Sequence, residues 1–419
     1  MEIAPQQFGT IGTGDGIADA MLCVDSDRPF EAMLHFWDGK SPANAVLVQL
    51  YGTKPDEADL LPIGVYRTND NGGLWKPILT PEEIERAKGF RGRIWKNGSG
   101  LEGEWSHPLG HHGQMHFEPP SRSLMVSADL CTTWDDFKKW ASRSREQLGV
   151  GAYRGHGSNK YRLQTTFHRV GRHRLERYCS DTLQEFRRHA EALLGERIDL
   201  NNGDDYSMLF GLAQHHGLPT PLLDLTSSPY VAAFFAFADA LESASVRPEV
   251  THVRVYGFTR DLLGGASTPV VTVPYFKPYL STLLISPRNN PRLYAQQGQF
   301  LVTNVADVES FICNMERKSD RKFLIAADIP VSCAVDALED LAFMGLTAAT
   351  MFPGLDGVCR MMKHAMSFKR EAVPLPPKPS DGSSDPESRG TSTGEVPQEG
   401  PVHVEADGPS AELQVGDKK

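Results

Sequence analysis

Cysteine is scarce in this sequence, and its cysteines lie far apart. The chain has six cysteines in 419 residues and no CxxC pair. Six scattered cysteines in so long a chain, without a CxxC pair, argue against both a disulfide framework and a cysteine-based zinc site. The adjacent His215 and His216 have no HExxH motif or third ligand at a suitable spacing, and neighbouring helical residues point in different directions. We therefore expect reduced thiols and no metal site.

Long apolar runs are also absent. No stretch approaches the roughly 18–20 apolar residues that would cross a bilayer. The start, MEIAPQQFGTIGTGDG, lacks the basic and apolar segments of a secretory signal. Hydrophobic residues make up 40% of the chain and charged residues 23%, which is typical of a globular protein in water. These absences predict a cytoplasmic protein without a membrane partner.

Basic residues are outnumbered by acidic ones, but unevenly. The formal net charge is −10, yet Tyr153–Ala190 contains nine Lys/Arg against three Asp/Glu. From Lys160 to Tyr178 the bases alternate with aromatic residues, a composition suited to phosphate contacts and base stacking. This stretch is either a nucleic-acid surface or a solvated helix face.

Residues 1–120 are predicted to form an N-terminal antiparallel β-rich domain, either a meander or a small barrel. Segments of strand type, such as AVLVQLYG, IGVYRT and LEGEWSH, are separated by turn formers such as Asn71-Gly72-Gly73. Gly9, Gly12, Gly14 and Gly16 follow no convincing strand pattern, and we expect a flexible start there rather than a dinucleotide loop. One hypothesis is that this domain binds a protein partner.

A mixed α+β domain is predicted over residues 130–366. Thr132 or Thr133 caps an amphipathic helix, and helical patterns fit residues 181–195, 205–216 and 229–243. The segments VTHVRVYGF, QFLVTN and KFLIAADI are typical of strands. Residues 371–419 are rich in Pro, Ser, Gly and acids, and such a composition cannot bury enough apolar surface to offset ordering entropy. We expect a disordered acidic tail there.

The helix predicted from Pro229 has an unusual start. Three hydroxyl residues, Thr226, Ser227 and Ser228, precede the proline, and the following residues are apolar on every face, which predicts a buried helix. Free N–H groups and the positive dipole end suit phosphate or ribose oxygens. Alternatively, the hydroxyls only cap the helix.

Five motifs in order resemble the FRG domain, a family named for its (F/Y)-Arg-Gly motif. They are Tyr153-Arg154-Gly155, AQHHGLPT at 213–220, LLDLT at 222–226, AQQGQF at 295–300 and FPGLDG at 352–357. The resemblance covers roughly residues 130–366. The chain departs from the family pattern at His216, Pro221 and Leu225, where the family has Tyr, Arg and Trp.

The motif order is also similar to that of ADP-ribosyltransferases. This resemblance implies that NAD is the substrate and that Arg154 grips its diphosphate as a bidentate donor, while Gly155 allows close approach beside Tyr153. It implies that Thr226 and Ser227 bind the nicotinamide ribose. In the third place the chain has Gln297 and Gln299, which cannot act as bases but can position a ribose hydroxyl or the target.

Three polar residues accompany these motifs. Asp224 lies among leucines, and we expect it to be buried and paired with Arg154 or a backbone amide, because a buried unpaired charge is costly. Gln214 and one of the adjacent histidines, His215, are expected to line the cleft, with Gly217 ending their helix.

Three functional hypotheses follow. The first is an NAD-dependent ADP-ribosyltransferase-like effector, of toxin or phage-defence type, that modifies RNA or protein. The second is a non-enzymatic module that binds a nucleotide or nucleic acid in the same cleft. The third makes the β-domain the partner-binding unit and the FRG domain its scaffold.

Overall fold

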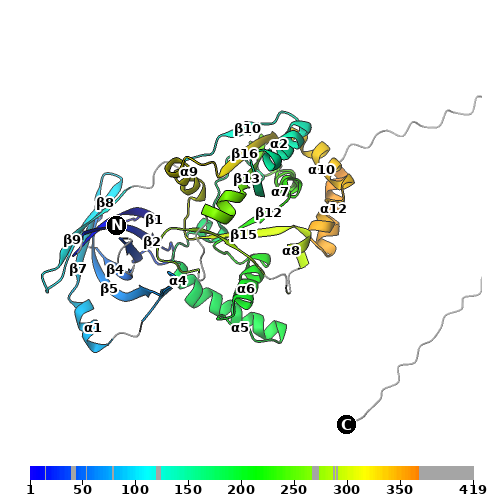
Figure 1. Cartoon of the computed structure of the whole chain (residues 1–419). Coiled ribbons are helices and arrows are strands. Elements are labelled where there is room, and N and C mark those ends of the chain that lie inside the picture. Colours follow the sequence, from blue (N-terminus) through cyan, green and yellow to red (C-terminus); the bar gives the residue numbers. More distant parts are fainter. Residues whose placement is uncertain are drawn as a thin grey trace, which may run out of the picture. The chain divides into compact units, whose positions relative to one another are not determined.

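The structure is a computed structural model that describes residues 1–14, 16–38, 44–52, 54–77, 80–118, 124–266, 273–285, 288 and 291–367. Met1–Lys369 form one compact unit (Figure 1). An antiparallel β-rich part precedes a mixed α+β part, which confirms the predicted fold class. The predicted tail, residues 371–419, lies outside the described residues.

The N-terminal part is a closed antiparallel barrel. Its strands, as far as the chain is described, are β1 (Gln6–Thr13), β2 (Gly16–Val24), β3 (Glu31–Trp37), β4 (Asn44–Tyr51), β5 (Glu57–Thr68), β6 (Leu74–Trp75), β7 (Arg91–Asn97), β8 (Gly100–Ser106) and β9 (His112–Phe117). The ring closes because β4 pairs with β5 and β9 pairs with β1, while β6 extends the sheet from β5. One helix, α1 (Pro81–Lys88), is capped by Thr80, as expected from its Thr-Pro start.

The prediction of a flexible glycine-rich start was wrong. Residues 6–13 and 16–24 form the hairpin β1–β2, which pairs along its whole length. Gly9 is needed because β9 crosses it closely: a Cβ there would lie 1.9 Å from the carbonyl oxygen of His116. Gly9 therefore serves strand packing, a role that weak local strand propensity concealed.

The second part is built on a mixed seven-stranded sheet, counted over the described residues, with the order β10-β16-β13-β11-β12-β15-β14. Its strands are β10 (Ala128–Leu130), β11 (Val150–His156), β12 (Leu222–Thr226), β13 (His252–Thr259), β14 (Leu280–Leu283), β15 (Gly298–Thr303) and β16 (Leu324–Pro330). Only β10 and β16 pair in parallel among these strands.

Helices surround this sheet. They are α2 (Trp134–Glu146), α3 (Thr166–Arg169), α4 (Leu175–Arg177), α5 (Leu183–Leu194), α6 (Gly203–His215), α7 (Pro229–Glu242), α8 (Pro291–Ala295), α9 (Val308–Ser319), α10 (Ala334–Phe343), α11 (Ala348–Met351) and α12 (Leu355–Ser367), with π-helical turns at Tyr178–Thr182 and Asp261–Ala266 and a 3-10 turn at Val331–Cys333. The three helices predicted at 181–195, 205–216 and 229–243 are confirmed as α5, α6 and α7, with ends within two residues. None of the helices in the described ranges is long and apolar enough to span a bilayer.

The sheet is nearly divided between β11 and β12. These strands share a single registered pair, Tyr153 with Thr226, whereas β12 pairs with β15 over five residues and β11 with β13 over six. Beyond that pair, β11 and β12 part. This gap positions the candidate site described below.

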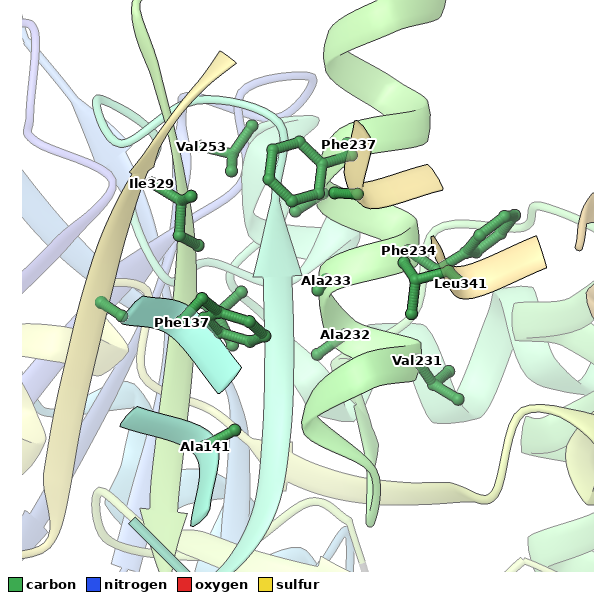
Figure 2. Packing of buried hydrophobic residues seen from close by; sticks show 14 of the residues in the cluster. Phe137, Ala141, Val231, Ala232, Ala233, Phe234, Phe237, Val253, Ile329 and Leu341 are labelled. Atoms are coloured by element: carbon green, nitrogen blue, oxygen red, sulfur yellow. The ribbon is translucent and has the colours of Figure 1, made fainter. Parts of the chain in front are cut away.

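Helix α7 packs directly on β11. Figure 2 shows Ala232 and Ala233 on the side of α7 that faces the strand, with Phe234 turned toward Leu341 of α10. Small residues on that side let the two backbones approach closely. The start of α7 is therefore held firmly beside the gap in the sheet.

Part of the basic stretch from Lys160 to Tyr178 is engaged in ion pairs with the barrel. Three of its arginines contact carboxylates of the barrel: Arg172 and Arg177 pair with Asp25 and Asp27, and Arg174 pairs with Glu31. The aromatic residues Phe167 and Tyr178 are 2% and 3% exposed, so they cannot stack on bases. Ion pairs distant in sequence therefore neutralise part of this stretch, while Lys160, Tyr161 and Arg169 stay exposed, and nucleic-acid binding by it remains a prediction.

Candidate functional site

A hollow of about 320 Å³ lies where β11 and β12 part. We call it the β11–β12 hollow. Its polar lining residues are Arg154, Gln214, His215, Asp224, Thr226, Arg292 and Gln296, and its other lining residues are Tyr153, Gly155, Gly211, Leu225, Ala232, Phe235, Leu293, Gly298, Phe300 and Phe352. Seven of the ten site residues predicted from the sequence are therefore brought together.

Arg154 lies at the gap itself. Its Nη1 donates to the main-chain carbonyl of Asp224 at 2.7 Å, so a side chain crosses between the strands just where their backbone pairing has ended. Its Nε donates to Nε2 of His156 at 3.0 Å. Burial lowers the pKa of Arg154 from its ordinary value, and the nearby Asp224 counteracts this effect. The guanidinium is thus fixed at two points and keeps further N–H groups for a ligand.

His156 holds the other side of this guanidinium as a neutral acceptor. Burial lowers the pKa of His156 well below its ordinary value, and the charges of Arg154, Arg169 and Arg254 act in the same direction. The ring is therefore uncharged at neutral pH, and its Nε2 can accept the hydrogen bond that Nε of Arg154 donates. A protonated ring could not make this contact.

Gln214 connects α6 with β12. The hydroxyl of Thr220 donates to Oε1 of Gln214, which leaves Nε2 to donate to Oδ2 of Asp224 at 2.7 Å. A hydroxyl donor on the amide oxygen thereby determines which way the amide points. The carboxylate of Asp224 is held by one oxygen only.

The expected burial of Asp224 was wrong. Its side chain is 54% exposed, although the other four residues of β12 are all buried. Its distance to Nη1 of Arg154 is 3.8 Å, so the expected partner is near but the carboxylate faces the hollow. The surrounding leucines made the motif seem more apolar than its exposed face is.

Tyr153 and Gly155 serve packing rather than direct ligand contact. The Tyr153 ring is 1% exposed, its hydroxyl is hydrogen-bonded to Ser144 at 2.8 Å, and it lies edge-on to Trp140. A Cβ on Gly155 would lie 1.9 Å from the carbonyl oxygen of Ala232. The close approach that requires this glycine is therefore that of α7.

The hydroxyls before α7 are mostly used locally. Ser228 caps the helix by accepting from the N–H of Val231 at 3.3 Å, and Thr226 accepts from the N–H of Ser228 at 3.2 Å. Ser227 donates to Oε1 of Gln297 at 3.1 Å, and its N–H donates to the Gln297 carbonyl at 3.1 Å. Thr226 alone of the three lines the hollow.

The two predicted glutamines are not lining residues. Gln297 lies beside the hollow with its side chain bound to Ser227, and its φ of 48° is in the left-handed region that glycine favours. Gln299 lies between Gly298 and Phe300, both of which line the hollow, so strand alternation turns Gln299 to the opposite face of β15.

Sequence reasoning missed an aromatic wall and a cation. Phe235 and Phe352 meet edge-to-face at 5.8 Å, and the guanidinium of Arg292 lies 5.5 Å from the Phe352 ring centre. Arg292 has no ion-pair partner within the part of the chain that the structure describes. The motif FPGLDG was the one local pattern that pointed to Phe352, but it is typical of a structural turn. No local pattern shows that Phe352 reaches α7.

No group of three or more His, Cys, Asp or Glu side chains in the described ranges is placed to hold a metal ion. The lining of the hollow instead combines two arginines, one carboxylate and two glutamine amides with three phenylalanine rings. Such a mixture suits an organic anion that contains a planar ring.

The comparisons with known proteins agree with part of the resemblance. The FRG domain family model matches residues 150–245, from the start of β11 to just beyond α7. This range includes Arg154, Gln214, Asp224 and Thr226, and over it the predicted resemblance is confirmed. No protein with a curated description matches the chain.

Proposed function

We propose that the β11–β12 hollow binds NAD and that the protein transfers the ADP-ribosyl group to RNA or protein, as a cytoplasmic effector of toxin or phage-defence type. The observation that carries this proposal is the convergence of Arg154, Asp224 and Phe352 from distant segments on one hollow in a divided sheet. A dinucleotide offers a diphosphate for the guanidinium and planar rings for the aromatic wall.

The charged lining residues of the hollow suit the diphosphate. Arg154 is a planar donor that is held in place by His156 and by the Asp224 carbonyl, so little side-chain entropy is lost when it binds. Arg292 adds a second positive charge from α8. Two guanidinium groups with one carboxylate leave the lining with a net positive charge that favours an anion.

The aromatic lining residues suit a nicotinamide or adenine ring. Phe235, Phe300 and Phe352 provide surfaces for stacking or edge contacts. Excluding water there strengthens the electrostatic contacts of the charged lining residues. The charged and aromatic residues together would hold both the diphosphate and a ring of a nucleotide.

The proposed chemistry is cleavage of the bond between nicotinamide and ribose. The departing nicotinamide leaves a ribosyl group with oxocarbenium character, which fixed dipoles and negative charge stabilise. Thr226, which lines the hollow, would orient the ribose hydroxyls, and Gln297 holds Ser227 next to it. Gln299 would position an acceptor that approaches from the other face of β15.

The acceptor is RNA or protein in this proposal, and the barrel is where a protein partner would bind. The first test incubates the purified protein with NAD labelled in the nicotinamide ring, with and without cell extract treated with ribonuclease or protease. Release of labelled nicotinamide supports the proposal, and the treatment that abolishes this release identifies the acceptor class. Intact NAD with every extract contradicts it.

Arg154→Ala provides the matched test of the site, with Arg93→Ala as the control. Arg93 is an exposed barrel residue that pairs with Asp59 at 3.0 Å, outside the hollow. We expect nicotinamide release to be lost in Arg154→Ala and retained in Arg93→Ala. Thermal unfolding of both proteins separates loss of the site from loss of the fold.

The second candidate function is a non-enzymatic nucleotide-binding module. It is favoured by the glutamines at the third motif, because neither Gln297 nor Gln299 can act as a base. In this case calorimetry would detect NAD or ADP-ribose binding that Arg154→Ala weakens, while NAD stays intact under all target conditions.

A further inference from the structure

We propose that Asp224 is the catalytic carboxylate of the β11–β12 hollow. This inference rests on the proposed function and assigns its missing acidic group. Gln297, just before β15, and Gln299 within it stand where the resemblance would place a carboxylate, so the reaction would need a carboxylate from elsewhere. Asp224 on β12 is the one acidic residue among the described lining residues of the hollow.

Only one of the two carboxylate oxygens of Asp224 accepts a hydrogen bond from a described residue. Oδ2 accepts from Nε2 of Gln214 at 2.7 Å, whereas Oδ1 has no hydrogen bond to any described residue. More than half of the side chain is exposed. The second carboxylate oxygen is therefore accessible to a ligand in the hollow.

The carboxylate is also held at a defined angle. Thr220 fixes the amide of Gln214, and that amide then fixes Oδ2, so the free Oδ1 is presented from a rigid strand. Gln214 is therefore a positioning residue for Asp224. Preorganised groups of this kind stabilise charge in a transition state without a reorganisation cost.

Asp224 lies close to where positive charge would develop on the ribose of a bound dinucleotide. Nη1 of Arg154, which is proposed to hold the diphosphate, lies 3.8 Å from Oδ2. A dinucleotide gripped there would place its ribose within reach of the same carboxylate. Negative charge close to the sugar favours an oxocarbenium-like state.

The step balances as follows. The bond between the ribose anomeric carbon and the pyridinium nitrogen breaks, and its electron pair stays on nicotinamide, which leaves neutral. A lone pair of water, or of a hydroxyl or amine acceptor, forms the new bond to the anomeric carbon. The acceptor's proton passes to Asp224 and then to solvent, so no redox partner is needed.

The experiment compares nicotinamide release and NAD binding by the full chain and four variants. Asp224→Asn removes the charge with little change of shape, Asp224→Glu keeps the charge, and Asp224→Ala leaves room for added formate. Asp59→Asn is the control, since Asp59 is an exposed barrel carboxylate that makes one ion pair with Arg93. Thermal unfolding is measured for each protein.

We expect Asp224→Asn to bind NAD while its release rate falls by about 100-fold or more, the range typical of general acid–base residues. Asp224→Glu should recover part of the rate, formate should raise the rate of Asp224→Ala, and Asp59→Asn should match the native rate. A native rate in Asp224→Asn would overturn the assignment but not the proposed function. Absence of release from the native protein would overturn the proposed function and the assignment with it.

If Asp224→Asn fails to fold, the formate test on Asp224→Ala and the glutamate variant decide the outcome. A folded Asp224→Ala protein that releases nicotinamide at the native rate without formate would also overturn the assignment. Gln214→Ala should lower the rate less than Asp224→Asn does, because it loosens the carboxylate without removing it.

Discussion

Gly155 of β11 lies against the carbonyl oxygen of Ala232 in α7, so closely that a methyl group on the glycine would lie 1.9 Å from that oxygen. This contact sets the distance between the helix and the strand. Because α7 begins at the edge of the β11–β12 hollow and β11 carries Arg154, the same contact determines how these parts of the site meet.

Gly155→Ala should destabilise the protein by about 3 kcal/mol, the upper end of the usual effect of overpacking, since both sides of the contact are backbone. Chemical unfolding monitored by circular dichroism measures this loss. Gly203→Ala is the control, because a Cβ at Gly203 meets nothing within 4 Å. Equal stability of the two variants would contradict the packing argument.

The local signals in the sequence identified most elements of the fold. Ser228 and Pro229 predicted the start of α7, and Thr133 predicted the start of α2, because capping depends on residues that are neighbours in the chain. The division between β11 and β12 could not be predicted in this way. It depends on which strands pair at long range, and only the structure shows that their ladder ends after Tyr153 and Thr226.

The candidate site was predicted only in part, because some of its residues come together through long-range contacts that local patterns do not show. Arg154, Gln214 and Thr226 belong to motifs, so a resemblance could point to them before the structure was known. Phe352 and Arg292 reach the hollow from segments whose local pattern suggests only a turn and a short helix. The exposure of Asp224 was missed because leucines on both sides of it suggested burial on both faces of the strand.

Phe352→Ala should weaken NAD binding by about 10-fold, because loss of an aromatic stacking surface typically costs about 1–3 kcal/mol per base. Titration calorimetry measures the dissociation constant. The matched control is Phe343→Ala, which removes a phenylalanine that is 93% exposed at the end of α10. Unchanged affinity in Phe352→Ala would show that the aromatic wall does not contact the ligand.

Stability should fall as the pH decreases from about 6.5 to about 4. Burial lowers the pKa of His35 and of His173 from 6.5 to about 4. Between these pH values the two histidines bind protons in the unfolded chain but not in the folded protein. The contribution of the neutral histidines to the free energy of unfolding is therefore complete above pH 6.5 and is lost on acidification. Each of these histidines contributes on the order of 2–3 kcal/mol across the range.

Urea unfolding at pH 7.0 and pH 5.0 measures this dependence. His173→Gln should reduce the difference between the two pH values, whereas His189→Gln, which changes an exposed residue on α5, should not. A pH difference in His173→Gln as large as that of the native protein would mean that this ring is solvated in the folded state.

Asp25→Ala should destabilise the protein more than Asp59→Ala, a change at an exposed carboxylate of the barrel. Asp25 is 1% exposed, its Oδ1 accepts from the N–H groups of His173 and Arg174, and its Oδ2 accepts from Arg177 at 2.9 Å. Its loss leaves buried donors without an acceptor, which typically costs about 3–5 kcal/mol. Asp59→Ala, at an exposed ion pair, should cost less than about 1 kcal/mol.

The same contacts bear on whether the barrel is a separable partner-binding unit. Arg174 is 3% exposed and reaches Glu31 in the barrel at 2.8 Å, so deleting residues 1–120 would leave a buried guanidinium without that partner. We therefore expect the truncated chain to unfold at a lower temperature than Asp25→Ala, which loses only part of the contact. A truncated protein that keeps both the native melting temperature and NAD-dependent activity would show that the barrel contributes neither stability nor chemistry to the FRG-like part, and would remove it from the proposed mechanism.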